Sequence, residues 1–160
     1  MSLVPIRRAI LSIAAILVLA SGAHAELGGP VSSVKVDGGR MGARMASLSM
    51  RGYARHDLTR GNGGLVHEFS NASGQVFAVT WSGPGKPDLR TVLGKYFGPY
   101  QASAGGGVGR VRHALRRPAQ VDQADLQIQT AGHMGWFHGV AYIPSLAPAG
   151  FSTADLPVQP

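Results

Sequence analysis

Alternating apolar and polar residues predict a β-hairpin in the first half of the chain. Residues 52–58 and 65–70 each have the composition and alternation typical of a strand, and residues 59–64 between them are rich in glycine. Asn62-Gly63 in this turn favours a type I′ conformation, because asparagine and glycine best tolerate the positive φ angles it requires. These features together predict two antiparallel strands.

The most strand-prone segment, residues 75–81, follows a second turn at residues 71–74. Its apolar side chains fall on both sides of an extended chain. They are Phe77, Val79 and Trp81 on one side, and Val76 and Ala78 on the other. Because a strand with two apolar faces is buried on both, this segment is predicted to lie in the middle of its sheet. Residues 125–130 and 134–143 predict a further antiparallel pair.

Residues 88–97 are the clearest helical segment of the chain. Their apolar residues fall at positions i, i+3, i+4, i+7 and i+8, which gives one apolar face. Pro87 and Asp88 suit a helix start, and Gly98-Pro99 suits a helix end. One amphipathic helix is therefore expected to pack on the sheet.

The remaining segments show weaker patterns. Residues 26–50 predict an extended arm with one short strand around residues 31–36, and residues 101–121 a flexible loop of Gly, Ala and Arg. Residues 144–160 predict an irregular tail with a turn of helix near residues 152–156. The fold class that follows is α+β, a twisted antiparallel sheet of five or six strands with one helix packed on it. A small β-barrel capped by the helix is the alternative.

The N-terminal pattern predicts a cleavable signal peptide over residues 1–25. Arg7 and Arg8 precede the apolar residues 9–20, and Ala23 and Ala25 are the small residues that signal peptidase accepts before a cut. The apolar run is too short for a permanent span, since about 18 Å of helix does not cross a hydrocarbon core of about 30 Å. The mature domain is expected to run from Glu26 to Pro160, without a transmembrane span, in the periplasm or outside the cell.

Export changes how the composition is interpreted. Loss of the two signal arginines reduces 15 Lys and Arg to 13 against 8 Asp and Glu, so the formal net charge falls from +7 to +5. The chain contains no cysteine, which excludes disulfides, thiol nucleophiles and cysteine-based metal sites. The mature domain must therefore be stabilised by packing and hydrogen bonds alone.

Positive charge gathers in one segment without acidic residues. Its members, the candidate anion-binding residues, are Arg110, Arg112, Arg116 and Arg117. A solvated basic loop explains the same residues without a ligand. For an exported domain the polyanions at hand are acidic polysaccharide and anionic lipid, and nucleic acid is not an expected partner.

Histidine is the residue type with the most chemical potential. His56, His67 and His133 are weak candidates for a metal site, but whether His56 and His67 meet depends on the hairpin register. His133 and His138 are five residues apart and would face opposite sides of one regular strand. Structural histidines are the alternative.

Aromatic residues offer a second kind of site. Trp81, Trp136, Phe137 and Tyr142 are candidates for a platform that stacks on a sugar or peptide, with core packing as the alternative. Catalysis has little support, because carboxylates are few, no G-x-S-x-G motif occurs and the glycine-rich runs lack the residues of a phosphate loop. No catalytic residue and no cofactor is predicted.

One block of sequence resembles a known family. Residues 74–96 (GQVFAVTWSGPGKPDLRTVLGKY), with residues 131–134 and 141–144, resemble the exported proteobacterial proteins grouped as domain of unknown function 2844. The resemblance implies a periplasmic or secreted protein with a single family domain and no established activity.

These observations favour an exported, non-enzymatic envelope protein that acts as a small binding or assembly module. Its partner is open, with an envelope protein, a polysaccharide or an anionic lipid surface as candidates. Two alternatives remain. One is a histidine-based metal-binding protein or metal-dependent enzyme, and the other is a polyanion binder that uses the basic segment.

Overall fold

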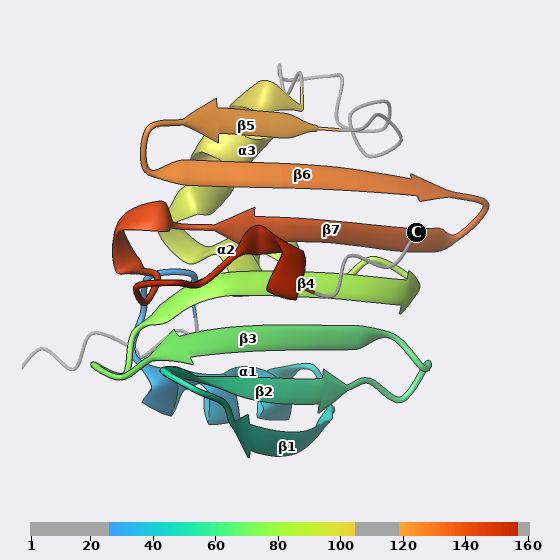
Figure 1. Ribbon diagram of the computed structural model, residues 1–160. Coiled ribbons are helices and arrows are strands. Elements are labelled where there is room, and N and C mark those ends of the chain that lie inside the picture. The colour runs from blue at the N-terminus through green and yellow to red at the C-terminus, as the bar shows by residue number, and fades with distance from the viewer. Residues whose placement is uncertain (1–25, 105–118, 157–160) are drawn as a thin grey trace, which may run out of the picture.

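The protein is a single seven-stranded antiparallel sheet with helices on one face (Figure 1). The structure, a computed structural model, describes residues 26–104 and 119–156. The strand order is β1-β2-β3-β4-β7-β6-β5. The strands are β1 Arg44–Ser49, β2 Tyr53–Thr59, β3 Leu65–Asn71, β4 Val76–Pro84, β5 Gln120–Gln123, β6 Leu126–His133 and β7 Trp136–Tyr142. The α+β class is confirmed, but the sheet has seven strands rather than five or six, and it is open, with β1 and β5 at its edges.

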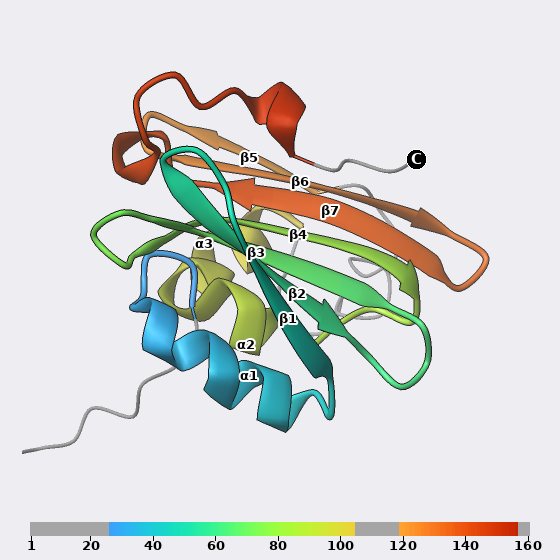
Figure 2. The same ribbon diagram turned by 60° about the horizontal axis from the view of Figure 1, so that its bottom comes forward.

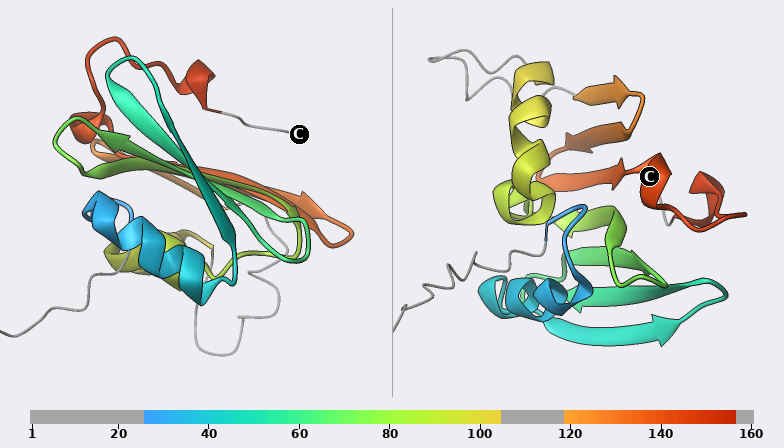
Figure 3. Two further views of the ribbon diagram at one scale, coloured as in Figure 1. Left: turned by 90° about the horizontal axis from the view of Figure 1, so that it is seen from below. Right: turned by 90° about the vertical axis from the view of Figure 1, so that its left-hand side faces the viewer.

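Three short α-helices cover one face of the sheet, called here the helix face (Figures 2 and 3). They are α1 Val34–Arg40, α2 Leu89–Leu93 and α3 Phe97–Ser103, with 3-10 turns at Val31–Ser33 and Gly94–Tyr96. The other face, called the open face, is crossed by the segment after β7, which contains short 3-10 turns at Pro144–Leu146 and Thr153–Asp155. Within the described ranges no helix is long and apolar enough to cross a membrane.

The larger core lies between the sheet and the helices. Val79 and Trp81 of β4 are almost fully buried there, packed in one cluster with Val92 and Leu93 of α2. This burial of apolar surface is what holds the helices on the sheet. The prediction that residues 75–81 form the central strand is confirmed, because β4 is the fourth of seven strands.

A smaller core fixes the C-terminal segment on the open face. Phe151 packs edge-on against Phe77, with ring centroids 4.7 Å apart, and stacks on Tyr142. Polar contacts hold the start of the segment, since Asp125 accepts hydrogen bonds from the backbone N–H and the hydroxyl of Ser145. The expected turn of helix near residues 152–156 is present, although the segment as a whole is docked.

The N-terminal arm differs from the prediction. Residues 31–36 form a 3-10 turn and part of α1 instead of a strand, because a helix buries Val34 against the core. The strand in this region is β1, which the sequence did not indicate. It is exposed along its whole length, so it has no buried face to produce an alternating pattern.

The helix predicted over residues 88–97 is divided into α2 and α3, and the helical region extends to Ser103. Asp88 caps α2 as expected, accepting a hydrogen bond from the N–H of Arg90 at 3.0 Å. Gly94, with φ +51°, ends α2, and the chain resumes as α3. Pro99 does not end α3, because it lies in the first turn, where a backbone N–H has no intrahelical partner to lose. The prediction of a loop from residue 101 is therefore wrong for residues 101–103, and residues 120 and 121 belong to β5.

The hairpins are confirmed, but the type I′ turn predicted at Asn62-Gly63 is not present there. Asn62 does not have the positive φ of a type I′ turn, although Gly63 does. That geometry occurs instead in the β6–β7 hairpin, at Met134 (φ +47°) and Gly135 (φ +85°). A register shift between β3 and β4 also places Phe77 in the same cluster as Ala78, so the alternation expected along β4 changes phase at this point.

Candidate functional site

A row of side chains crosses the open face at one level of the sheet. The strand registers pair these residues in succession from β2 to β5. They are Asp57, His67, Thr80, Val140, Gln129 and Gln120. At about 4.8 Å between strands, the row is about 24 Å long. We call it the transverse row.

One end of the transverse row is an ion-paired cluster. Asp57 accepts a hydrogen bond from Nη2 of Arg55 at 3.0 Å, and Nε of Arg55 lies 2.8 Å from Asp57 Oδ1 in the same ion pair. His67 Nδ1 lies 2.6 Å from that oxygen. Burial alone would raise the pKa of the Asp57 carboxyl, but the hydrogen bonds and charges of Arg55 and His67 outweigh it and lower that pKa. Asp57 is therefore ionised, and His67 donates from Nδ1, which leaves Nε2 as the nitrogen free for other contacts.

Thr80 occupies the middle of the row, directly beside His67 in the register. Its side chain is buried, and its hydroxyl has no hydrogen-bond partner among the described residues. An Asp-His-Thr arrangement for nucleophilic catalysis needs a hydrogen bond from the hydroxyl to the histidine and access for a substrate. Thr80 has neither, so the cluster does not form such a triad.

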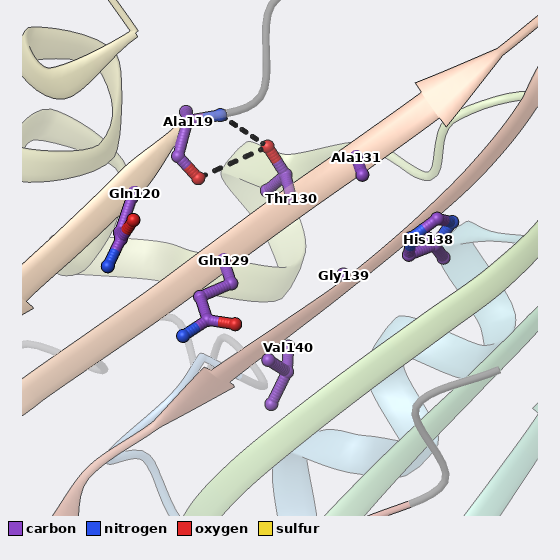
Figure 4. A pocket seen from close by; sticks show the side chains of 8 residues that line it. All are labelled: Ala119, Gln120, Gln129, Thr130, Ala131, His138, Gly139 and Val140. Atoms are coloured by element: carbon purple, nitrogen blue, oxygen red, sulfur yellow. Dashed lines mark hydrogen bonds between the residues drawn. The ribbon is translucent and has the colours of Figure 1, made fainter. Parts of the chain in front are cut away.

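The other end of the row is a groove. One hollow of about 280 Å³ lies over β5, β6 and β7, and Figure 4 shows Gln120, Gln129 and His138 among its lining side chains. A second hollow of about 210 Å³ shares Gln129 and Val140 with the first. Its remaining lining residues are Gln127, Tyr142, Thr153 and Leu156. Because the two hollows adjoin at Gln129 and Val140, we treat them together as the amide groove. Thr153 and Leu156 of the C-terminal segment line the second hollow.

The amide groove carries hydrogen-bonding groups without charge. None of the residues that line its two hollows is Asp, Glu, Lys or Arg. Gln127 and Gln129 are exposed, and within the described ranges their side-chain amides form no hydrogen bond. Each amide has donors and an acceptor to offer a ligand, and the ring of Tyr142 lies beside them. Burial raises the pKa of the Tyr142 hydroxyl, so it too is neutral and able to donate.

A second polar cluster is buried on the helix face. The His56 ring is hydrogen-bonded to Ser47 at Nδ1 (2.9 Å) and to Ser70 at Nε2 (3.0 Å), and burial lowers its pKa. Across from it, Glu68 is 1% exposed, and neither of its carboxylate oxygens has a hydrogen-bond partner among the described residues. Burial, and then the charge of Asp37, raise the Glu68 pKa to about 8. His56, Glu68 and Ser70 are buried and belong to the core, while Ser47 on the edge strand is exposed.

The histidines proposed for a metal site lie apart. His56 opposes Glu68 and His67 opposes Asp57, so the two rings project from opposite faces of the sheet. His133 lies at the end of β6, away from both. The described part of the chain holds no group of three His, Cys, Asp or Glu residues able to bind a metal. His133 and His138 do share the open face, because the tight hairpin pairs His133 with Trp136 and His138 with Ala131.

The aromatic candidates are also divided between the faces. Trp81 is buried on the helix face, where Phe137 also projects, while Trp136 and Tyr142 project from the open face. Only Tyr142 lines the amide groove. Four other candidates, Arg110, Arg112, Arg116 and Arg117, lie outside the described residues, as do Ala23 and Ala25. Glu26 is described, and it accepts a hydrogen bond from the N–H of Lys95 at 3.1 Å.

Sequence reasoning did not single out Asp57, Gln127 or Gln129. The signal for the two glutamines was present, since they occupy the polar positions of the alternating segment 125–130. Nothing comparable marked Asp57, because its partners Arg55 and His67 come together only through the β2–β3 register.

Fold and site together define an α+β protein with an open antiparallel sheet and a polar groove on the face opposite the helices. The family model described as Protein of unknown function (DUF2844) matches residues 23–156, and the chain belongs to this family. No curated protein and no solved structure was found to match the chain.

Proposed function

We propose that the protein is an exported, non-catalytic module that binds a neutral glycan segment in the amide groove. The observation that carries this proposal is the pair of unpartnered amides, Gln127 and Gln129, beside Tyr142 in a groove whose lining has no charged residue. Sugars offer many hydroxyl groups and one apolar ring face, which amides and an aromatic ring complement.

The shape of the groove supports an extended ligand. Its two hollows are joined through Gln129 and Val140, and the transverse row continues from them towards His67. A chain of sugar residues laid across the strands would meet Gln120, Gln129 and Val140 on β5, β6 and β7, and would reach His67 only beyond the buried Thr80. A small compact ligand would use only one hollow.

Export is part of the proposal and rests on the N-terminal pattern. The basic start, the apolar residues 9–20 and the small residues Ala23 and Ala25 are those of a signal peptide. A periplasmic or secreted protein meets the glycans of the cell envelope, and the uncharged lining of the amide groove fits their neutral segments. Cell fractionation with detection of the N-terminal residue tests this part, and a cytoplasmic protein that still begins at Met1 would contradict it.

The absence of an activated nucleophile in the transverse row supports a binding role. Thr80 is buried beside His67 without a hydrogen bond to it, so the hydroxyl of this row has no route to a substrate. Hydrolysis of the bound glycan, detected by product analysis, would contradict the non-catalytic proposal.

The test of binding uses soluble oligosaccharides of N-acetylglucosamine of increasing length, titrated by calorimetry. We expect affinity to rise with length, and Gln129→Ala to weaken binding about threefold to tenfold, the value of one or two lost hydrogen bonds. Gln101→Ala is the matched control, because Gln101 is an exposed glutamine on α3 at the helix face. Equal loss in both variants, or no binding by the wild type, would overturn the proposal.

A further inference from the structure

Strand β1 forms an unprotected edge of the sheet. All six of its residues are exposed, and it pairs with β2 on one side only. Figure 1 shows it as the last strand of the sheet, at the end opposite β5. Protein sheets usually shield such an edge with proline, a bulge or charged side chains. Strand β1 contains no proline and no bulge, and Arg44 at its first position is its one charged residue.

The direction of the free backbone groups follows from the β1–β2 hairpin. The N–H of Met50 donates to the carbonyl of Tyr53, so this pair lies at a hydrogen-bonded position of the ladder. Because hydrogen-bonded and non-hydrogen-bonded pairs alternate, the backbone groups of Leu48 and Ala46 point towards β2. Those of Met45, Ser47 and Ser49 therefore point outward.

Exposed apolar side chains gather at the same edge. Seven large hydrophobic residues of the described chain are exposed, and four of them belong to β1 or its immediate surroundings. These four are Val36, Met45, Leu48 and Met50. Val36 lies on α1, which runs beside β1 in Figure 2 and contacts it. Val36 and Met45 lie on the helix face and Leu48 and Met50 on the open face, so a strand added at this edge would have apolar neighbours on both faces.

The charge around the edge is positive. Arg44 and Arg51 lie at the two ends of β1 and are exposed, and neither forms an ion pair within the described ranges. Of the carboxylates on the neighbouring elements, Asp57 of β2 is held by Arg55 and Asp37 of α1 is buried. A strand that pairs with β1 therefore meets a cation at each end and apolar side chains between them.

We propose that β1 binds an extended segment of a partner protein as an eighth strand, with apolar residues in its middle and acidic residues at its ends. Backbone hydrogen bonds to Met45, Ser47 and Ser49 would supply affinity, and Arg44 and Arg51 would select the acidic ends. A second copy of this chain fits less well. Antiparallel pairing of two β1 strands brings Arg44 of one copy close to Arg51 of the other at both ends, and like charges across strands are destabilising. This surface is separate from the amide groove, so binding here does not depend on the glycan proposal.

The test uses a capped synthetic peptide of alternating valine and threonine, flanked by aspartate pairs, and a second peptide with lysine pairs in their place. We expect the aspartate peptide to bind at least about tenfold more tightly than the lysine peptide, with an affinity that falls with salt. Amide hydrogen exchange at Ser47 and Ser49 should slow on binding. Equal affinity for the two peptides, or unchanged exchange in β1, would overturn the proposal.

Two variants locate the site. Ser49→Pro removes an outward N–H without breaking the β1–β2 ladder and should abolish binding, while Asp122→Pro, at the outward position of the opposite edge strand β5, should leave it unchanged. Leu48→Glu keeps the backbone and should also weaken binding by adding a negative charge among apolar contacts. Concentration-dependent dimerisation that Ser49→Pro removes would instead assign the edge to a second copy and refute the heterologous proposal.

Discussion

His67 Nδ1 lies 2.6 Å from Asp57 Oδ1, across the pairing of β2 with β3. Two nitrogens of Arg55 contact the same carboxylate. Arg55 and Asp57 lie two residues apart on β2, and His67 is paired with Asp57 on β3, so the three side chains form one cluster on the open face. This cluster ends the transverse row and leaves His67 Nε2 as its available nitrogen.

The first prediction concerns the charge of Asp57. Its folded pKa is lowered, so the ion pair stabilises the protein above the unfolded pKa of 3.8, and this contribution is lost as the pH falls through the lower folded value. Asp57→Asn should reduce the free energy of unfolding by about 1 kcal/mol at neutral pH. The difference from wild type should vanish in strong acid. Urea denaturation across this range measures it, and a difference that persists in acid would contradict the ion-pair explanation.

The second prediction concerns close packing between β4 and β7. A Cβ atom on Gly139 would lie 2.3 Å from Cζ2 of Trp81, which is buried and cannot move freely. Gly139→Ala should therefore lower stability by about 1–3 kcal/mol or more. Gly39→Ala is the matched control, since that position in α1 is open and alanine favours a helix. Thermal denaturation of the two variants should shift in opposite directions.

The third prediction concerns Glu68, whose pKa is raised from 4.5 to about 8 by burial and by Asp37. The folded state holds the proton more tightly than the unfolded state, so stability should fall as the pH rises between these values. The slope is at most about 1.4 kcal/mol per pH unit. Glu68→Gln keeps the shape without the titration and should remove this fall.

Comparing the wild type with the Glu68→Gln variant isolates the contribution of Glu68 to the pH dependence of stability. His56, whose pKa is lowered by burial, titrates in both and acts in the opposite direction, because its neutral form is favoured in the folded state. Chemical denaturation at a series of pH values provides the measurement. Parallel pH profiles for the wild type and the variant would show that Glu68 does not hold its proton.

The fourth prediction concerns the C-terminal segment. Phe151 contacts the rings of Phe77, Phe69 and Tyr142, so Phe151→Ala should lower stability by about 2 kcal/mol and release the segment from the open face. Hydrogen exchange should then rise through residues 150–156. Because Leu156 and Thr153 wall the amide groove, oligosaccharide binding should weaken as well. Thr153→Ala, an exposed truncation, should change stability by less than about 0.5 kcal/mol.

The local pattern of apolar and polar residues predicted the strands that have a buried face. The alternation at residues 125–130 and the apolar run at residues 75–81 both correspond to strands, β6 and β4, because burial imposes periodicity on them. Strand β1 was not predicted, because every one of its residues is exposed and no alternation of buried and exposed positions marks it. Val34 was misassigned to a strand because its burial comes from packing of α1 on the sheet, which no local pattern reveals.

The sequence by itself determined the α+β class, the family resemblance, the central strand and the absence of disulfides. Composition, cysteine count and the periodicity of buried strands are properties of short stretches of sequence and do not depend on which strands pair. Only the tertiary structure decided which polar residues meet. His56 and His67 were separated to opposite faces, and Asp57, His67, Gln129 and Gln120 were aligned in one row, by the strand registers. Since shifting a strand by one residue exchanges its faces, neither the amide groove nor the Arg55–Asp57–His67 cluster could be derived before the registers were known.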